Sequence, residues 1–287
     1  MYFGLSEDQI FFQDNVKKFL EDNAPLDAVK KITEGADLST KDELHQGLIN
    51  LGINNILIPE ENGGLGLDLL FASAVSQSLG EGIATLPFVG PYVIAPIAIK
   101  YGASDSQKEK LFNEMSQNLI NCGVGFSEYF GSRDSSDLSI SNNKITGRTL
   151  FVLDVDFASH VMLCDKKGQI GLVSLESQGI EIIDLTTVDK TRTYKEMIFK
   201  DTPIEILDKT KTSIEAAEMA LSAGRIVAAA DSLGASQAMI NKAVEYSKER
   251  KQFNRVIGSF QAVKHMCAEM TAELEPCYSL VWHAAHS

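Results

Sequence analysis

The sequence is poor in cysteine, and its four cysteines are widely spaced. Cys122, Cys164, Cys267 and Cys277 form no C-x-x-C pair in a chain of 287 residues. Disulfide frameworks and structural zinc sites are recognised by closely and regularly spaced cysteines. This spacing therefore predicts reduced, mostly buried thiols and no metal site.

Long apolar runs are absent as well. No stretch approaches the ~20 apolar residues that a membrane helix needs. The opening segment, MYFGLSEDQIFF, has no basic region ahead of a long apolar core, so it lacks the pattern of a secretory signal. We therefore expect a cytoplasmic protein for which a membrane is not a partner.

Positive charge is scarce. The chain has 26 Lys and Arg against 39 Asp and Glu, a net charge of −13 at pH 7. Nucleic acids and anionic membranes attract basic surfaces, so this balance argues against either as the main partner. A small anionic ligand is still allowed, because local basic groups matter more than the total. The composition, 44% hydrophobic and 23% charged, is that of an ordinary globular protein.

The residue pattern divides the chain into three parts. Residues 1–118 are predicted to be helical, beginning with a capping box in which Ser6 and Gln9 exchange hydrogen bonds. Apolar residues then recur at helical spacing. Further helices are expected at Lys41–Leu51, Leu69–Leu79 (with Gly80 as C-cap) and Ser106–Met115.

Residues 119–210 show short apolar or alternating runs separated by Gly, Asn and Asp, a pattern typical of antiparallel strands. The expected strands are Lys144–Phe151, Ala158–Leu163, Ile170–Leu175, Gly179–Ile183 and Tyr194–Phe199.

Residues 211–287 return to helix. Glu215–Arg250 contains no proline and many helix formers, and a second helix is expected from about Ser259, with Pro276 as a possible break. Because strands and helices do not alternate along the chain, a Rossmann sheet is a poor fit. The glycines of residues 63–66 lack G-x-G-x-x-G spacing and predict a turn. The fold class is therefore α+β with several domains: helical, antiparallel β, then helical.

One segment is far more specific than these patterns. RKQFNRVIGSFQ, residues 250–261, is similar to the R-x-Q-F-G-x-x-I-x-x-F-Q signature of acyl-CoA dehydrogenases. Asn254 stands where the family usually has glycine, and asparagine tolerates a positive φ better than most residues. Residues 5–9, 51–66 and 102–108 resemble other segments of the family in the same order.

The resemblance implies an FAD-dependent enzyme that oxidises acyl-CoA thioesters and passes electrons to an electron transfer flavoprotein. A guanidinium pairs well with phosphate oxygens, which suits Arg250 to the FAD pyrophosphate. The resemblance places the signature residues against the FAD of a neighbouring subunit, and so implies a dimer or tetramer. The implied FAD contacts are Phe126, Ser127, Phe151, Leu153, Arg250, Gln252, Phe253, Ile257 and Gln261.

Several positions depart from the family. Phe151 replaces a tryptophan that packs on the flavin and keeps an aromatic surface. Leu153 replaces a hydroxyl residue and loses a hydrogen bond to the ring. Arg133 stands where the family has a serine that contacts acyl-CoA, and its charge suits a CoA phosphate instead. Arg225 corresponds to an arginine beside the substrate pocket.

The catalytic base is not found. In the family a carboxylate removes the α-proton of the thioester while the β-hydrogen leaves as hydride. Most members carry this carboxylate about a hundred residues beyond the equivalent of Ser287, and a minority carry it directly before the equivalent of Arg225. That position here is Gly224, which cannot act as a base. The family ends in a four-helix bundle, so we expect a chain truncated in that bundle.

Two alternatives stay open. One is a catalytically silent flavoprotein or scaffold subunit of a mixed oligomer, favoured by Leu153 and Gly224. The other is a related flavin enzyme on the same architecture, such as a nitroalkane oxidase.

Overall fold

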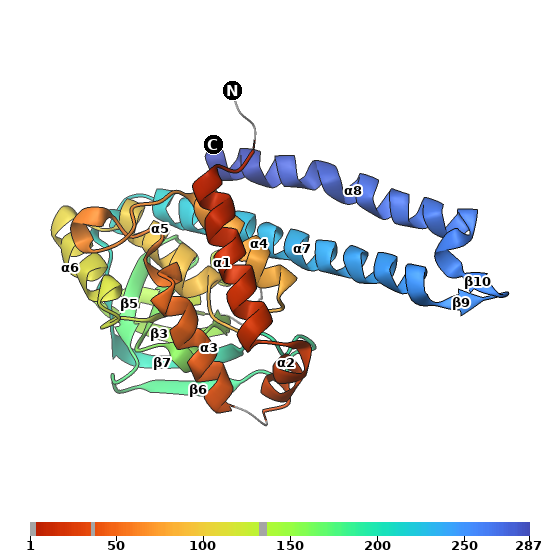
Figure 1. Ribbon diagram of the computed structural model, residues 1–287. Helices are drawn as coiled ribbons and strands as arrows, with labels where there is room; N and C mark the ends of the chain where they lie inside the picture. Colours follow the sequence, from red (N-terminus) through yellow and green to blue (C-terminus); the bar gives the residue numbers. More distant parts are fainter. Residues whose placement is uncertain (1–3, 36–37, 132–136) are drawn as a thin grey trace. The chain divides into compact units, whose positions relative to one another are not determined.

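The computed structural model describes residues 4–35, 38–131 and 137–287, and in it helices precede and follow a central group of strands along the chain (Figure 1). The α-helices are α1 (Glu7–Asn23), α2 (Leu26–Thr33), α3 (Leu38–Asn50), α4 (Leu69–Glu81), α5 (Ala95–Gly102), α6 (Asp105–Ser116), α7 (Glu215–Glu249) and α8 (Gln261–His286). The short helices are η1 (Ile53–Asn55), η2 (Glu60–Asn62), η3 (Val89–Ile94), η4 (Val155–Phe157), η5 (Asp208–Lys211) and η6 (Ile257–Ser259).

The capping box at the start of α1 is present as predicted. Ser6 N donates to Gln9 Oε1 at 2.8 Å, and Gln9 N donates to Ser6 Oγ at 3.2 Å. One finer prediction was wrong, because Gly80 lies inside α4 and does not cap it. Pro276 lies inside α8, which continues to His286 without a break.

The strands are β1 (Cys122–Gly125), β2 (Ser139–Ser141), β3 (Lys144–Leu153), β4 (His160–Cys164), β5 (Ile170–Ser174), β6 (Ile180–Asp184), β7 (Tyr194–Pro203), β8 (Glu205–Ile206), β9 (Lys251–Gln252) and β10 (Arg255–Val256). The main sheet has the order β6-β7-β3-β1-β4-β5-β8, with β2 beside β3. Asn142 and Asn143 have positive φ in the two-residue β2–β3 turn, as primed hairpin turns require.

The predicted antiparallel pairing is found for the strands of the main sheet with one exception, because β1 and β4 are parallel. The chain leaves β1, reverses into β3 on one side of it, and reverses again at η4. It then enters β4 on the other side of β1 in the original direction. The sheet is therefore mixed, with one parallel pair in an otherwise antiparallel order.

Contacts divide the chain into two compact units. The sheet unit consists of residues 30–68 and 85–225, and the helical unit of residues 1–29, 69–84 and 226–287. The domain limits at residues 118 and 210 stay a prediction. No helix in the described ranges is long and apolar enough to cross a membrane.

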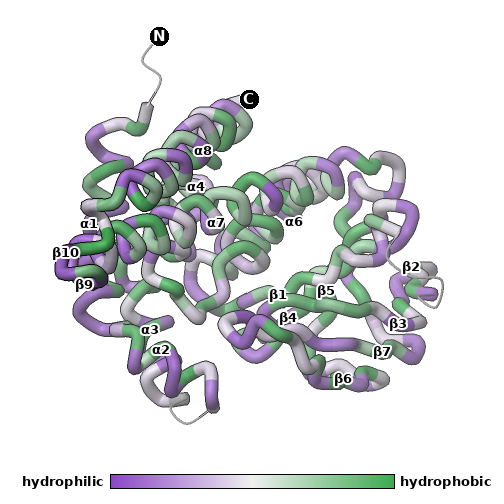
Figure 2. Tube along the Cα trace, turned by 90° about the vertical axis from the view of Figure 1, so that its right-hand side faces the viewer, coloured by the Kyte–Doolittle hydropathy of each residue, from purple (hydrophilic) through white to green (hydrophobic). Residues whose placement is uncertain are grey.

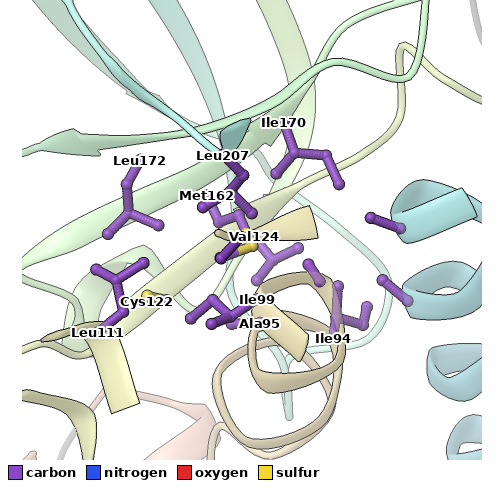
Figure 3. Close-up of a cluster of buried hydrophobic side chains, with 14 of the residues drawn as sticks. Ile94, Ala95, Ile99, Leu111, Cys122, Val124, Met162, Ile170, Leu172 and Leu207 are labelled. Carbon is purple, nitrogen blue, oxygen red and sulfur yellow. The ribbon is translucent and has the colours of Figure 1, made fainter. Parts of the chain in front are cut away.

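The core of the sheet unit lies between the helices of residues 89–116 and one face of the sheet. Figure 3 shows Ile94 and Ile99 meeting Val124 of β1 and Met162 of β4, all 6% exposed or less. The strands β1, β4 and β5 are largely hydrophobic (Figure 2), as expected for strands in the middle of a covered sheet. This core fixes the end of β1.

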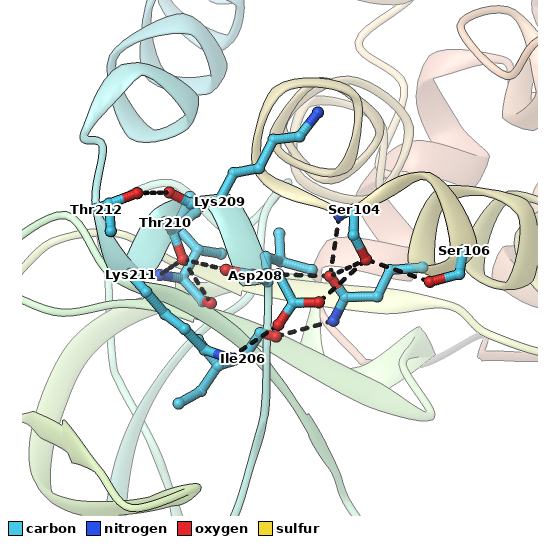
Figure 4. Close-up of polar contacts among 11 residues, drawn as sticks. Ser104, Ser106, Ile206, Asp208, Lys209, Thr210, Lys211 and Thr212 are labelled. Atoms are coloured by element: carbon cyan, nitrogen blue, oxygen red, sulfur yellow. Dashed lines mark hydrogen bonds and ion pairs between the residues drawn. The ribbon is translucent and has the colours of Figure 1, made fainter.

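A polar network ties α6 to the end of the sheet (Figure 4). Gln107 closes a capping box with Ser104, and its Oε1 also accepts from the backbone N–H of Asp208 at 3.0 Å. Its Nε2 donates to the carbonyl of Ile206 at 2.9 Å, while Ser104 Oγ donates to Asp208 Oδ2 at 3.0 Å. The glutamine of the 102–108 segment thus serves as a structural anchor.

In the helical unit, α4 and α7 touch backbone to backbone. A Cβ on Gly80 would stand 2.0 Å from the carbonyl oxygen of Asp231, and one on Gly234 would stand 1.9 Å from that of Gln77. Side chains cannot fit at such distances, so only glycine allows this crossing. This contact explains why position 80 is a glycine although it lies within a helix.

Candidate functional site

A bulge in β3 sets the orientation of Phe151. The pairing of β3 with β7 shifts register between Thr149 and Val152, and Phe151 has φ +56°. Aromatic residues rarely adopt this conformation, and bulges often re-aim a side chain beside a functional site. The Phe151 side chain is 41% exposed, and its ring meets that of Tyr194 edge to face at 6.3 Å. The bulge therefore keeps an aromatic surface open on the sheet.

The end of β1 lies beside this bulge. Ser127 Oγ donates to the carbonyl of Leu150 at 2.6 Å and lies 3.3 Å from Thr149 Oγ1. Phe126 points into the core. The hydroxyl of Ser127 thus donates its proton to β3, and its acceptor oxygen and the backbone of this segment are left for a ligand's polar edge.

Leu153, the last residue of β3, is half-buried and pairs with Val124 of β1 and Tyr194 of β7. The structure thus brings four predicted residues together: Phe126 and Ser127, directly after β1, and Phe151 and Leu153, on β3.

Arg225 lies on α7, and its guanidinium carbon is 5.8 Å from the centre of the Phe130 ring. The preceding residue, Gly224, faces Ile94, whose side-chain atoms would stand 2.8 Å from an added Cβ. No carboxylate occupies this position, and Ile94 fills the space that one would need. Arg133 lies outside the described residues.

The signature segment forms a hairpin. Strands β9 and β10 pair around Phe253 and Asn254, whose φ angles are +52° and +60°. The left-handed conformation predicted for Asn254 is confirmed. The backbone N–H of Ile257 donates to the carbonyl of Arg250 at 2.8 Å and closes the loop.

Aromatic and cationic groups are exposed on this hairpin. Phe253 is 89% exposed and meets Phe260 edge to face at 6.1 Å, while the Arg255 guanidinium lies 3.9 Å from the Phe260 ring centre. Gln252 and Gln261 are also exposed. Such a surface offers stacking and charge-assisted hydrogen bonds to a ligand.

The sequence did not indicate a polar cluster that His45, Tyr92 and Asp154 form near the end of β3. His45 Nε2 and Tyr92 Oη are 2.8 Å apart, and the His45 ring meets Phe157 edge to face at 4.6 Å. Burial lowers the pKa of His45 to about 4, so this imidazole is neutral at pH 7. Asp154 directly follows β3, is buried, and has a left-handed backbone conformation. Burial and the negative charge of Asp154 both raise the pKa of Tyr92. A histidine and a tyrosine 47 residues apart gave no local signal.

Burial also raises the pKa of Asp154 to about 6, against the attraction of Arg192 and Lys41. From about pH 4 to pH 6 the folded protein therefore holds a proton that the unfolded chain has lost, and stability falls as pH rises. We expect Asp154→Asn to raise the Tm by about 5 °C at pH 7.5 and not at pH 4. Thermal unfolding at both pH values measures this. The exposed Asp42→Asn serves as control, and an equal gain at pH 4 contradicts the assignment.

A cavity of about 610 Å³ lies in the sheet unit away from these residues. It is bordered by Lys110, which pairs with Glu205 at 3.0 Å, and by His160. None of the predicted site residues that the structure describes lines it. Its position alone therefore gives no reason to place the reaction there.

The architecture, helices followed by a mixed sheet and further helices, is that of a class of flavoprotein oxidoreductases. Family models agree: "Acyl-CoA dehydrogenase, N-terminal domain" matches residues 6–118, and "Acyl-CoA dehydrogenase, C-terminal domain" matches residues 214–287. The chain belongs to the acyl-CoA dehydrogenase family, whose members depend on FAD.

Individual relatives are distant. The short-chain specific acyl-CoA dehydrogenase of Megasphaera elsdenii is 27% identical over 269 residues, covering 85% of this chain and 70% of that protein. The CarC subunit of the caffeyl-CoA reductase–Etf complex of Acetobacterium woodii is 23% identical over 313 residues, covering 99% of this chain and 80% of that protein. The structure of butyryl-CoA dehydrogenase from Megasphaera elsdenii matches with a TM-score of 0.84 at 22% identity, covering 99% of this chain and 80% of that one.

The described residues fit FAD in two respects. The open ring of Phe151, with Tyr194 beside it, offers an apolar surface of the kind an isoalloxazine packs on. The exposed Arg250 and Phe253 offer a cation and an aromatic face for the dinucleotide. One respect differs, since the proton of the Ser127 hydroxyl is already donated to the carbonyl of Leu150.

Proposed function

We propose that this chain binds FAD and acts on the Cα–Cβ bond of an acyl-CoA thioester, exchanging electrons with an electron transfer flavoprotein. The observation that carries the proposal is the β3 bulge, which holds Phe151 at φ +56° with its ring open. Strain of this kind persists where surrounding structure enforces it, and it gathers at functional sites. The names of the relatives, a short-chain acyl-CoA dehydrogenase and a subunit of an Etf complex, support the same chemistry.

Different residues are assigned to different parts of FAD. Phe151 packs on the ring, Leu153 adds an apolar edge, and the backbone of Phe126 and Ser127 meets the polar edge. In a dimer or tetramer, Arg250 pairs with the pyrophosphate of the FAD that the neighbouring subunit binds. The same FAD is also contacted by Gln252, Phe253, Ile257 and Gln261. When bound, FAD supplies the hydride acceptor.

Arg225 and Arg133 are assigned to the substrate, Arg225 near the thioester and Arg133 at a CoA phosphate. The family resemblance supports both assignments. The base that takes the α-proton is unassigned. A cytoplasmic location stays a prediction.

The test is the visible absorption spectrum of the protein after loading with FAD, before and after anaerobic addition of short-chain and aryl acyl-CoA thioesters. We expect FAD to bind. We expect its visible absorbance to bleach on addition of one of these substrates, because the flavin is reduced. A chain that takes up no FAD at all would falsify the proposal.

Gly224 and Ile94 favour a second function, that of a silent flavin-binding subunit that pairs with an active relative. Here FAD binds, and no acyl-CoA bleaches it. The double variant Gly224→Glu, Ile94→Ala installs a carboxylate at the position used by a minority of the family and makes room for it. If only the base is missing, this variant bleaches with acyl-CoA, whereas the matched Gly224→Gln, Ile94→Ala variant does not.

A further inference from the structure

The carboxylate of Glu128 is buried without a partner. Glu128 is 1% exposed, and neither of its carboxylate oxygens has a hydrogen-bond partner within the described ranges. Burying a carboxylate in this way is strongly unfavourable, because the charge loses its hydration and gains nothing in return. Proteins resolve this situation by keeping the carboxylate protonated or by pairing it with a cation.

A cation lies beside the turn that contains Glu128. Backbone hydrogen bonds from Tyr129 N to Phe126 O (3.1 Å) and from Gly131 N to Glu128 O (3.3 Å) define this turn. The guanidinium of Arg225 lies over Phe130, two residues beyond Glu128. Residues two apart have Cα atoms within about 7 Å of each other. The guanidinium of Arg225 therefore lies on the turn that carries Glu128, and a pair between the two side chains needs a change of the Arg225 rotamer.

Helix α7 is positioned for such a pair. Ala217 and Ala220, in its first turns, belong to the same buried cluster as Phe126 of the β1 end. Arg225 follows little more than one turn later along the helix, which rises 1.5 Å per residue. The start of α7 and the segment that carries Glu128 thus share one buried cluster, and Arg225 and Glu128 both lie in the sheet unit.

We propose that Glu128 is the internal counter-ion of Arg225 and positions its guanidinium for the acyl-CoA thioester. A guanidinium has five N–H donors, and a bidentate carboxylate uses two of them. The remaining donors are left for an oxygen of the substrate. Glu128 is a positioning residue in this arrangement, and its role in substrate binding rests on the proposed function.

The pairing itself is tested by thermal unfolding of the full chain without added flavin, as Glu128→Gln, Arg225→Gln and the double variant. We expect Glu128→Gln to lower the Tm of the wild type. In the Arg225→Gln background the same change raises the Tm, because it removes a carboxylate that has lost its cation. A rise of equal size in both backgrounds shows that Glu128 is unpaired and overturns the proposal.

The positioning role is tested in FAD-loaded protein by titration with butyryl-CoA. Glu128→Gln and Arg225→Gln each weaken butyryl-CoA binding about tenfold, with FAD affinity unchanged. Arg225→Lys recovers part of the loss only where Glu128 is present. Glu218→Gln, an exposed carboxylate on α7, changes binding less than twofold. Normal butyryl-CoA binding by Glu128→Gln overturns the positioning role. A wild type that takes no FAD overturns the proposed function, and the unfolding cycle then decides the pairing.

Discussion

Gly234→Ala is expected to lower the free energy of unfolding by about 3 kcal/mol, a fall in Tm of about 5 to 10 °C. The added methyl group would stand 1.9 Å from the carbonyl oxygen of Gln77 and 2.9 Å from the backbone nitrogen of Glu81. Both are backbone atoms of α4, which cannot move aside without separating the two helices. Alanine gains about 1 kcal/mol in helix propensity, too little to offset the clash.

Gly224→Ala is the matched control, since it lies on the same helix. Its methyl group would meet only side-chain atoms, Cδ1 and Cγ1 of Ile94 at 2.8 Å and Cγ1 of Val89 at 3.8 Å. A side-chain end can move, so stability should change by about 1 kcal/mol or less in either direction. Urea and thermal unfolding of both variants measure the difference. Equal losses in the two variants contradict a backbone contact at Gly234.

Arg250→Gln is expected to weaken FAD binding by about 10- to 100-fold. A bidentate, charge-assisted pair with phosphate contributes about 1.5 to 3 kcal/mol, which glutamine does not replace. Arg250→Lys should fall between the two, because lysine keeps the charge without the planar fork. Equilibrium titration with FAD, followed by flavin fluorescence, measures the affinities.

Lys251→Gln is the control for this prediction. Lys251 is the next residue of the hairpin, is equally exposed, and occupies a position that the family signature leaves variable. Its loss should change FAD affinity less than threefold at physiological salt. An equal effect of both substitutions indicates general attraction by hairpin charge and removes the specific role of Arg250.

The site was only partly predictable from sequence. The hairpin could be predicted well, because Arg250, Phe253 and Asn254 lie in one short segment whose residue order is specific. The bulge at Phe151 could not, because it arises from the register between β3 and β7, some 45 residues apart. The inward hydroxyl of Ser127 and the buried carboxylate of Glu128 depend likewise on partners distant in sequence.

The sequence by itself determined the helical and strand segments, the capping box at Ser6 and the family to which the chain belongs. These follow from periodicity, caps and short motifs, which act between residues a few positions apart. The tertiary structure alone decided that β1 runs parallel to β4, that Gly80 packs inside a helix crossing, and which polar groups are buried. The reason is that strand neighbours, helix crossings and burial depend on contacts between distant segments, which no local pattern specifies.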